Sequence, residues 1–228
     1  MSRKNYTLIL REKLIDRGAS LIGVAHLEGY LPPSFDQFSR GVSIGVRLSD
    51  SIVDELRTGP TKAYAYHYHA INRFLDDLAI FTTNLFQEWD FRAFPIPTSQ
   101  TVDLKHHKAH LSHKMVATRA GLGWIGKSAL LITPEYGPRI RLATVLTDAP
   151  LRPGKPITES LCEKCQECMK ACPVGAINGS LWTVKSERVD LLDVDLCAAI
   201  IDQEKTELGA PVCGLCVRAC PKGGSRPG

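Results

Sequence analysis

The segment CEKCQECMKACP at residues 162–173 carries four cysteines in the order CxxCxxCxxxCP. This is the spacing of bacterial ferredoxins, in which three closely spaced thiolates bind one [4Fe–4S] cluster and the fourth, before proline, binds the other. Near the end of the chain, Cys197 is followed after fifteen residues by CGLCVRACP at residues 213–221. The second run is therefore the same motif with its first cysteine displaced by an insertion.

The crossed pairing of this motif uses all eight cysteines of the chain. The first predicted set is Cys162, Cys165, Cys168 and Cys220, and the second is Cys172, Cys197, Cys213 and Cys216. Two structural zinc ions are the alternative, because CxxC pairs also bind zinc. The CxxCxxC triplet and the two Cys-Pro endings favour two [4Fe–4S] clusters. No cysteine precedes residue 162, and in a reducing cytosol such a concentration indicates metal binding rather than disulfides.

The composition is that of an ordinary globular protein. The 228 residues are 44% apolar and 23% charged, which suits one mid-sized domain with a small appendage. A net charge of +4 does not indicate the dense basic stripe of a nucleic-acid-binding protein. The apolar run at residues 6–10 ends at Arg11, too soon for a signal peptide, and no stretch approaches the roughly 18 apolar residues of a membrane span. The sequence therefore predicts a cytoplasmic protein without a membrane partner.

Local patterns predict mixed helices and strands before residue 150. We expect helices over residues 5–17, 50–56, 61–87 and 105–120, strands over 20–25, 42–46 and 91–96, and a hairpin formed by 129–133 and 139–146. Prolines at 150, 153 and 156 indicate a linker. The predicted domains are thus residues 1–150, an α/β domain, and residues 151–228, the cluster domain.

The loop GLGWIGKS at residues 121–128 matches both the GxGxxG dinucleotide pattern and the GxxxxGKS phosphate loop. Both patterns require a strand before the loop and a helix after it, so that phosphate meets the helix N-terminus. Here a predicted helix precedes the loop and a strand-like segment follows, which disfavours both nucleotide interpretations. Two uses of the glycines stay open: a helix end followed by a tight turn, or a backbone that lies flat against a large ligand.

Three segments carry a resemblance to a known family. The segments are AGLGWIGK at residues 120–127, TDAPL at 147–151, and LDVDLC at 192–197 with the cysteines that follow it. They resemble epoxyqueuosine reductase, a cobalamin-dependent, two-cluster enzyme related to reductive dehalogenases. The resemblance implies an α+β protein: a nitroreductase-like α/β domain that holds cobalamin, followed by a small bacterial-ferredoxin-like two-cluster domain. It also implies an oxidoreductase whose clusters pass electrons singly to the cobalt. The residues that would lie along the corrin are Gly121, Gly123, Trp124, Gly126 and Lys127.

The chain departs from this family in two respects. The place of the family's catalytic aspartate reads FPIPTS at residues 94–99, without an acid, and the nearby Asp103 falls in an apparent insertion. The sequence ends at Gly228 without the helical repeats that help the family hold tRNA. We therefore expect a paralogue that acts on a small-molecule substrate, not on tRNA, with an electron donor such as a ferredoxin or flavodoxin.

Four histidines precede the glycine loop: His106, His107, His110 and His113. Spacings of four and three place His106, His110 and His113 on one face of the predicted helix. They could donate protons, bind cobalt or another metal, or form a solvated polar face. Our hypothesis is that His110 or His113 supplies the proton that the missing aspartate would have given. The alternative function is a ferredoxin-like electron-transfer or corrinoid-activating protein without its own cobalamin.

Overall fold

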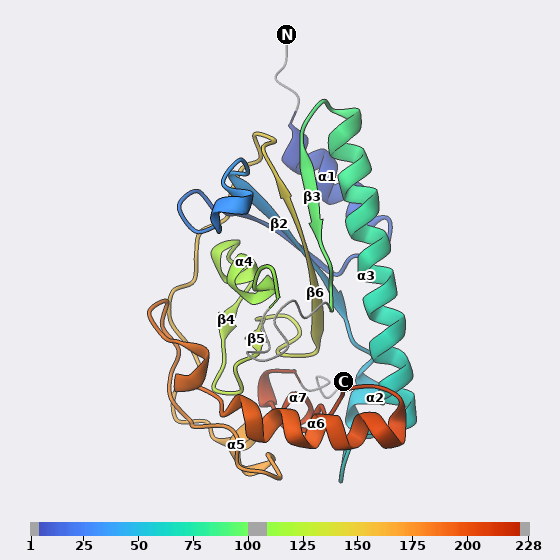
Figure 1. The fold of residues 1–228 in the computed structure, drawn as a ribbon, viewed down its shortest axis with the longest axis vertical. Coiled ribbons are helices and arrows are strands. Elements are labelled where there is room, and N and C mark those ends of the chain that lie inside the picture. Colours follow the sequence, from blue (N-terminus) through green and yellow to red (C-terminus); the bar gives the residue numbers. More distant parts are fainter. Residues whose placement is uncertain (1–4, 100–108, 224–228) are drawn as a thin grey trace. The chain divides into compact units, whose positions relative to one another are not determined.

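The computed structural model describes residues 5–99 and 109–223 (Figure 1). The helices are α1 (Tyr6–Ile15), α2 (Asp50–Asp54), α3 (Lys62–Glu88), α4 (His113–Arg119), α5 (Glu167–Lys170), α6 (Val194–Leu208) and α7 (Leu215–Arg218). The strands are β1 (Leu21–His26), β2 (Arg40–Arg47), β3 (Ala93–Ile96), β4 (Trp124–Ile125), β5 (Leu131–Ile132) and β6 (Ile140–Thr147). The predicted α+β class is confirmed. Among the described residues, no helix combines the length and the apolarity needed to cross a membrane.

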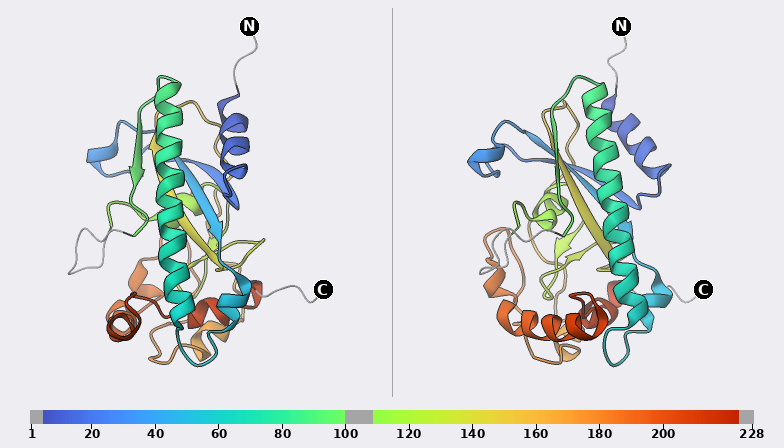
Figure 2. Two further views of the ribbon diagram at one scale, coloured as in Figure 1. Left: turned by 90° about the vertical axis from the view of Figure 1, so that its right-hand side faces the viewer. Right: turned by 45° about the vertical axis from the view of Figure 1, so that its right-hand side comes forward.

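The described residues form two compact units that are interleaved along the chain. The first takes the residues up to Val46, Asn72–Leu122 and Arg141–Ile157, and the second takes Arg47–Ile71, Gly123–Ile140 and the residues from Thr158 onward. The uninterrupted helix α3 therefore contributes residues to both units (Figure 2). The predicted boundary at residue 150 lies inside the first unit. All eight cysteines belong to the second unit, together with two earlier segments of the chain.

The first unit is built on a four-stranded sheet in the order β1-β2-β6-β3. β1 pairs antiparallel with β2, with Leu21 opposite Gly45, and β3 pairs antiparallel with β6, with Ile96 opposite Thr144. The strand β2 is buried from Gly41 to Val46 without the alternation of a half-exposed strand. Such a run indicates a strand covered on both faces. A buried cluster packs beside the sheet: Ala25, Leu27, Phe35, Phe38, Ile96, Leu111, Val116, Ala120 and Leu146.

The predicted hairpin of residues 129–133 and 139–146 is wrong. The strand β5 pairs with β4, which comes from the glycine loop, whereas β6 joins the four-stranded sheet. Between β5 and β6, Thr133 and Gly137 exchange two backbone hydrogen bonds of 2.9 Å and close a tight turn. The two strand-forming segments were identified, but their spacing does not reveal that each finds its partner elsewhere in the chain.

The second unit has its own core, drawn from distant segments. Its buried members are Leu48, Val53, Leu56, Tyr64, Ala65, Ala210, Val212 and Val217. Gly214, just before α7, has a positive φ of 80°, and a Cβ there would lie 2.7 Å from Leu56 Cδ1 and 2.8 Å from Tyr64 Cε1. The cysteine-bearing segment around α7 therefore packs directly against residues that precede and begin α3.

Arg139 links the early segment of the second unit to the turn before β6. Its side chain is 3% exposed, and its guanidinium donates to Asp54 Oδ1 at 2.6 Å and to Asp50 Oδ1 at 3.2 Å. The backbone carbonyl of Arg139 also accepts a hydrogen bond of 2.9 Å from Leu48 N–H. A buried cation in two ion pairs fixes the position of α2, which carries both aspartates.

Replacement of Arg139 by methionine is expected to lower the free energy of unfolding by about 2 kcal/mol, because charge-assisted hydrogen bonds are lost at a buried position. Urea unfolding followed by circular dichroism measures this loss. The control is Arg92→Met, which breaks the ion pair between Arg92 and Asp148. Because the Arg92 side chain is 66% exposed, this variant should lower the free energy of unfolding by less than about 1 kcal/mol. Equal losses in the two variants would contradict the assignment.

Candidate metal centre

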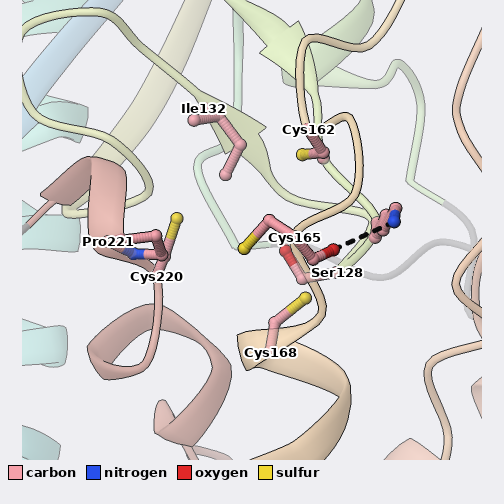
Figure 3. A pocket seen from close by; sticks show the side chains of 9 residues that line it. Ser128, Ile132, Cys162, Cys165, Cys168, Cys220 and Pro221 are labelled. Carbon is pink, nitrogen blue, oxygen red and sulfur yellow. Dashed lines mark hydrogen bonds between the residues drawn. The ribbon is translucent and has the colours of Figure 1, made fainter.

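A pocket in the second unit is lined by four cysteines that are far apart in the sequence (Figure 3). It spans about 300 Å³, part of it open to solvent. The four sulfurs face one shared space in Figure 3. The lining residues are Gly126, Lys127, Ser128, Ile132, Cys162, Cys165, Cys168, Cys220 and Pro221.

Local structure explains how these four cysteines meet. Cys162 and Cys165 belong to a turn in which Cys165 N–H donates to the Cys162 carbonyl at 3.0 Å, and Cys168 follows within α5. Cys220 comes from the other run, directly after the end of α7. Helices α5 and α7 pack against each other, which brings the second run back to the first. The pocket thus contains the members of the first predicted set.

The remaining four cysteines form a second group. Burial raises the pKa of the Cys216 thiol far above its usual value, and the neighbouring Cys213 and Cys197 raise it further, as do Cys168 of the first set and Cys172. Burial likewise raises the pKa of Cys197, with Cys213 and Cys172 adding to it. Ala176 N–H donates to Cys172 Sγ at 3.3 Å. The members of the second predicted set thus lie near one another, and their assignment to one cluster stays a prediction.

Thiol pKa values are raised in the first group too. Burial raises the pKa of Cys220 to about 11, and Cys162, Cys168 and Cys165 add to the effect while the backbone at Lys222 opposes it. Burial also raises the pKa of Cys168, followed by the influence of Cys162 and Cys165. The neutral form is therefore favoured for Cys168, Cys197, Cys216 and Cys220 in the metal-free chain. A cationic metal centre would stabilise thiolates here and would release protons on binding.

The arrangement of the sulfurs favours clusters over the zinc alternative. A structural zinc needs four donors at about 2.0–2.3 Å from one point. Within the part of the chain that the structure describes, no three histidine, cysteine, aspartate or glutamate side chains stand close enough to hold a single metal ion. The four sulfurs of the pocket instead face one shared space. In a [4Fe–4S] cluster each thiolate binds a different iron, which suits such spacing.

The second half of the glycine loop forms one wall of this pocket. Lys127 is 6% exposed, and its Nζ donates to the Cys165 carbonyl at 2.9 Å, drawn as a dashed line in Figure 3. A Cβ at Gly126 would lie 2.7 Å from Ile132 Cγ1 and 3.4 Å from Cys162 Sγ. Both residues therefore serve the cysteine pocket in this structure, although the resemblance assigns them to the corrin.

The first half of the loop meets the protein's own backbone. A Cβ at Gly121 would lie 2.6 Å from the Lys155 carbonyl oxygen, and one at Gly123 would lie 2.2 Å from the Ile132 carbonyl oxygen. Trp124 is 4% exposed, and no described residue accepts a hydrogen bond from its Nε1. The glycines are thus explained by packing, and the buried indole N–H of Trp124 is left without an acceptor among the described residues. Corrin contact by these residues stays a prediction.

The order of elements around the loop is the one predicted. Helix α4 precedes it and the strand β4 lies within it, so no helix follows the GKS residues. Neither the phosphate loop nor the dinucleotide pattern has the helix N-terminus on which it depends.

The predicted histidine helix is wrong in its extent. Helix α4 begins at His113, with the Ser112 side chain accepting a hydrogen bond from Met115 N–H, and His110 lies in the bend before it. His110 and His113 therefore do not share a helix face. His106 and His107 lie outside the described residues. The helix begins only after Ser112 because the serine side chain accepts a hydrogen bond from a backbone N–H of the first turn.

Both ring nitrogens of His113 have partners. Nε2 lies 3.2 Å from the Pro97 carbonyl and Nδ1 lies 2.8 Å from Thr144 Oγ1. Because a carbonyl only accepts, Nε2 carries the proton and Nδ1 accepts from the threonine hydroxyl. Burial lowers the pKa of His113, as does Arg141, while the Pro97 carbonyl and Asp76 raise it. A neutral imidazole results. Ligation of cobalt would require one of these hydrogen bonds to break.

Polar residues near His113 were missed by the sequence analysis. Asp76 Oδ1, on α3, accepts a hydrogen bond of 3.1 Å from Thr98 N–H. Arg141 donates to Asn72 Oδ1 at 3.0 Å and to Ser99 Oγ at 3.2 Å. The segment that lacks an acid in sequence therefore has a carboxylate from α3 beside it. No spacing pattern links residues 76 and 98, so only the fold reveals this.

Comparison with known proteins identifies the cysteine region. Residues 161–223 match the family described as the 4Fe-4S double cluster binding domain, which confirms the predicted two-cluster domain. The epoxyqueuosine reductase of Listeria monocytogenes is 38% identical over 117 residues, 51% of this chain and 28% of that protein. That of Escherichia coli is 35% identical over 116 residues, 50% of this chain and 30% of that protein. The predicted resemblance is confirmed, and it spans less than a third of these relatives' length.

Solved structures share the fold over nearly the whole chain. A crystal structure of epoxyqueuosine reductase with an epoxyqueuosine-modified tRNA-Tyr stem loop matches 96% of this chain and 66% of that one, with a TM-score of 0.61 and 22% identity. The catabolic reductive dehalogenase NpRdhA, in complex with 3-bromo-4-hydroxybenzoic acid, matches 95% of this chain and 31% of that one, with a TM-score of 0.72 and 18% identity.

The expectation that excluded tRNA is contradicted by these matches. It assumed that the family holds tRNA outside the region shared with this chain. The solved reductase with a bound tRNA stem loop nevertheless covers 96% of this chain, and the relatives of similar sequence are epoxyqueuosine reductases. The fold seen here is therefore part of a tRNA-binding enzyme in at least one relative.

The pairing of the cysteines can be tested with double variants. Cys162→Ala/Cys220→Ala should retain about half of the wild-type iron, because the crossed pairing places both residues on one of two clusters. Cys162→Ala/Cys172→Ala should lose nearly all of it, because these two residues serve different clusters. Iron and acid-labile sulfide are measured on anaerobically purified protein. Pairing in sequence order predicts the opposite result for the two variants.

His113 should make the stability depend on pH. Its lowered pKa means that the unfolded chain binds a proton first as the pH falls below about 6.5. The free energy of unfolding should therefore fall between pH 7.5 and pH 5.5, and it should fall less in His113→Gln. Urea midpoints at the two pH values measure this difference. His110→Gln is the control, because it removes no buried imidazole; identical pH dependence in all three proteins would exclude the effect.

Proposed function

We propose that this chain is an iron–sulfur reductase that binds two [4Fe–4S] clusters through its eight cysteines. The supporting observation is the pocket lined by the sulfurs of the first set, Cys162, Cys165, Cys168 and Cys220. The second set is Cys172, Cys197, Cys213 and Cys216; Cys216 lies on α7, which packs against α5, the helix of Cys168. Four thiolates for each cluster are the donors that such clusters require, and bound clusters supply one-electron transfer.

Cobalamin is the proposed second cofactor. The chain resembles epoxyqueuosine reductases, and a reductive dehalogenase of the same fold, with a TM-score of 0.71 and 17% identity, is described in connection with B12-dependent dehalogenation. In this chain the unpaired Trp124 N–H is the group best placed to donate a hydrogen bond to such a cofactor. Cobalamin would supply the organometallic chemistry, and the residues of the protein would position it.

The proposed substrate is epoxyqueuosine in tRNA or a nucleoside derivative of the same kind. Support comes from the named activity of the relatives and from the relative bound to a tRNA stem loop. His110 and His113 are the proposed proton donors. His110 is exposed, whereas His113 must first release the Pro97 carbonyl from its Nε2–H.

An electron-transfer or corrinoid-activating protein without its own cobalamin is the second candidate. The observation that favours it is the filled space around the glycines. Carbonyl oxygens of Lys155 and Ile132 approach Gly121 and Gly123 so closely that these positions need glycine whether or not a corrin binds. The candidates agree on the clusters and differ on cobalamin.

The first experiment is chemical analysis of anaerobically purified protein. About eight iron and eight sulfide ions are expected for each chain, because each of two clusters holds four of both. Zinc without sulfide would refute the proposal. Addition of cob(II)alamin should then shift its absorption spectrum to that of the base-off form. Clusters without such a shift would favour the second candidate, and conversion of epoxyqueuosine in tRNA-Tyr would establish the substrate.

Trp124→Phe gives a sharper test of the cobalamin site. The variant keeps an aromatic ring but lacks the N–H, so the affinity for cob(II)alamin should fall about three- to tenfold, as for one neutral hydrogen bond. Iron and sulfide should stay at wild-type values. Unchanged affinity would remove Trp124 from the proposed site.

A further inference from the structure

Lys127 is a buried cation beside the pocket of the first cysteine set. Its side chain is 6% exposed, and its Nζ hydrogen bonds to the neutral carbonyl of Cys165 at 2.9 Å. Within the described ranges, no carboxylate forms an ion pair with it. Lysine is seldom buried, because removal of an ammonium group from water is costly unless a negative charge compensates it. The negative charge available here is that of a cluster held by four thiolates.

The loop around Lys127 holds this cation in place. Gly126 N–H donates to the Leu130 carbonyl at 2.8 Å, and Ala129 N–H donates to the Gly126 carbonyl at 2.9 Å. A Cβ at Gly126 would lie 2.7 Å from Ile132 Cγ1, so a side chain at this position would have to displace Ile132. The Lys127 side chain therefore extends from a turn that backbone hydrogen bonds hold in place.

We infer that the Lys127 ammonium raises the one-electron reduction potential of the cluster bound by Cys162, Cys165, Cys168 and Cys220. This inference rests on the proposed function. When one electron from a chemical reductant enters the cluster, no bond changes and the negative charge of the site grows by one. A fixed positive charge in the pocket wall stabilises the more negative state, and the effect is strong where water is excluded.

The second cysteine group has a different electrostatic environment. One cation near it is Arg188, which is exposed to solvent and lowers the pKa of Cys197. Water and dissolved ions screen an exposed charge much more than a buried one. The two clusters are therefore inequivalent. The cluster beside Lys127 has a less negative reduction potential than it would have without that charge.

The test is a redox titration of the whole chain, purified anaerobically and followed by electron paramagnetic resonance. Lys127→Gln keeps an N–H donor for the Cys165 carbonyl but removes the charge. At a fixed solution potential it should lower the reduced-to-oxidised ratio of one cluster at least tenfold, which is 59 mV for one electron. Lys127→Arg, which keeps the charge, should change the ratio less than threefold. Arg188→Gln, the exposed control, should also change either ratio less than threefold.

Three results would overturn the inference. Lys127→Gln with full iron and sulfide content and unchanged potentials would show that the charge does not act on the cluster. Loss of half of the iron in Lys127→Gln would show that the lysine serves assembly instead. A wild-type chain without iron and sulfide would refute the proposed function itself and this inference with it. Unchanged potentials refute this inference alone.

Discussion

The packing of α7 against α5, which places the second cysteine run beside the first, is the constraint on which the second unit depends. Cys220 reaches the pocket of Cys162, Cys165 and Cys168 only because α7 packs against α5. The segment around α7 is held in turn by Leu56 and Tyr64, which press against Gly214. The cysteine region therefore cannot form its pockets from its own residues alone. Segments 47–71 and 123–140 supply the surfaces against which it folds.

Electrostatics connects this packing to metal binding. Burial raises the pKa of Cys216 in one group and of Cys220 in the other, so these two thiols favour the neutral form where the clusters require thiolates. Binding of the metal centre then supplies the charge compensation that the protein lacks, and folding and cluster assembly become coupled. Lys127 is a buried cation that lines the pocket of the first set. Its placement on the pocket wall gives the chain a means of making two otherwise similar clusters different.

Local signals predicted what depends on local chemistry. The period of α3, the apolar strands β1 and β2 and the double-cluster cysteine motif were all evident from spacing. Long-range pairings were not: β5 joins the two-residue strand β4, and Leu48, Val53 and Leu56 enter the core of the cysteine unit although they look like any apolar segment. Asp76 beside Thr98 and Pro97 beside His113 are also products of the fold. Only the Ser112 cap, which starts α4 at His113, was a local signal that sequence reading passed over.

The glycine loop shows how a motif can be explained before any ligand is considered. At Gly121 and Gly123 a side chain would strike backbone carbonyls, and at Gly126 it would strike Ile132. The pattern of glycines is thus required by the protein's own packing, and a nucleotide or corrin need not be invoked for it. What packing leaves unexplained is an indole N–H without an acceptor at Trp124 and a buried ammonium at Lys127. These two polar groups, and not the glycines, are where the loop shows a need for partners beyond the polypeptide.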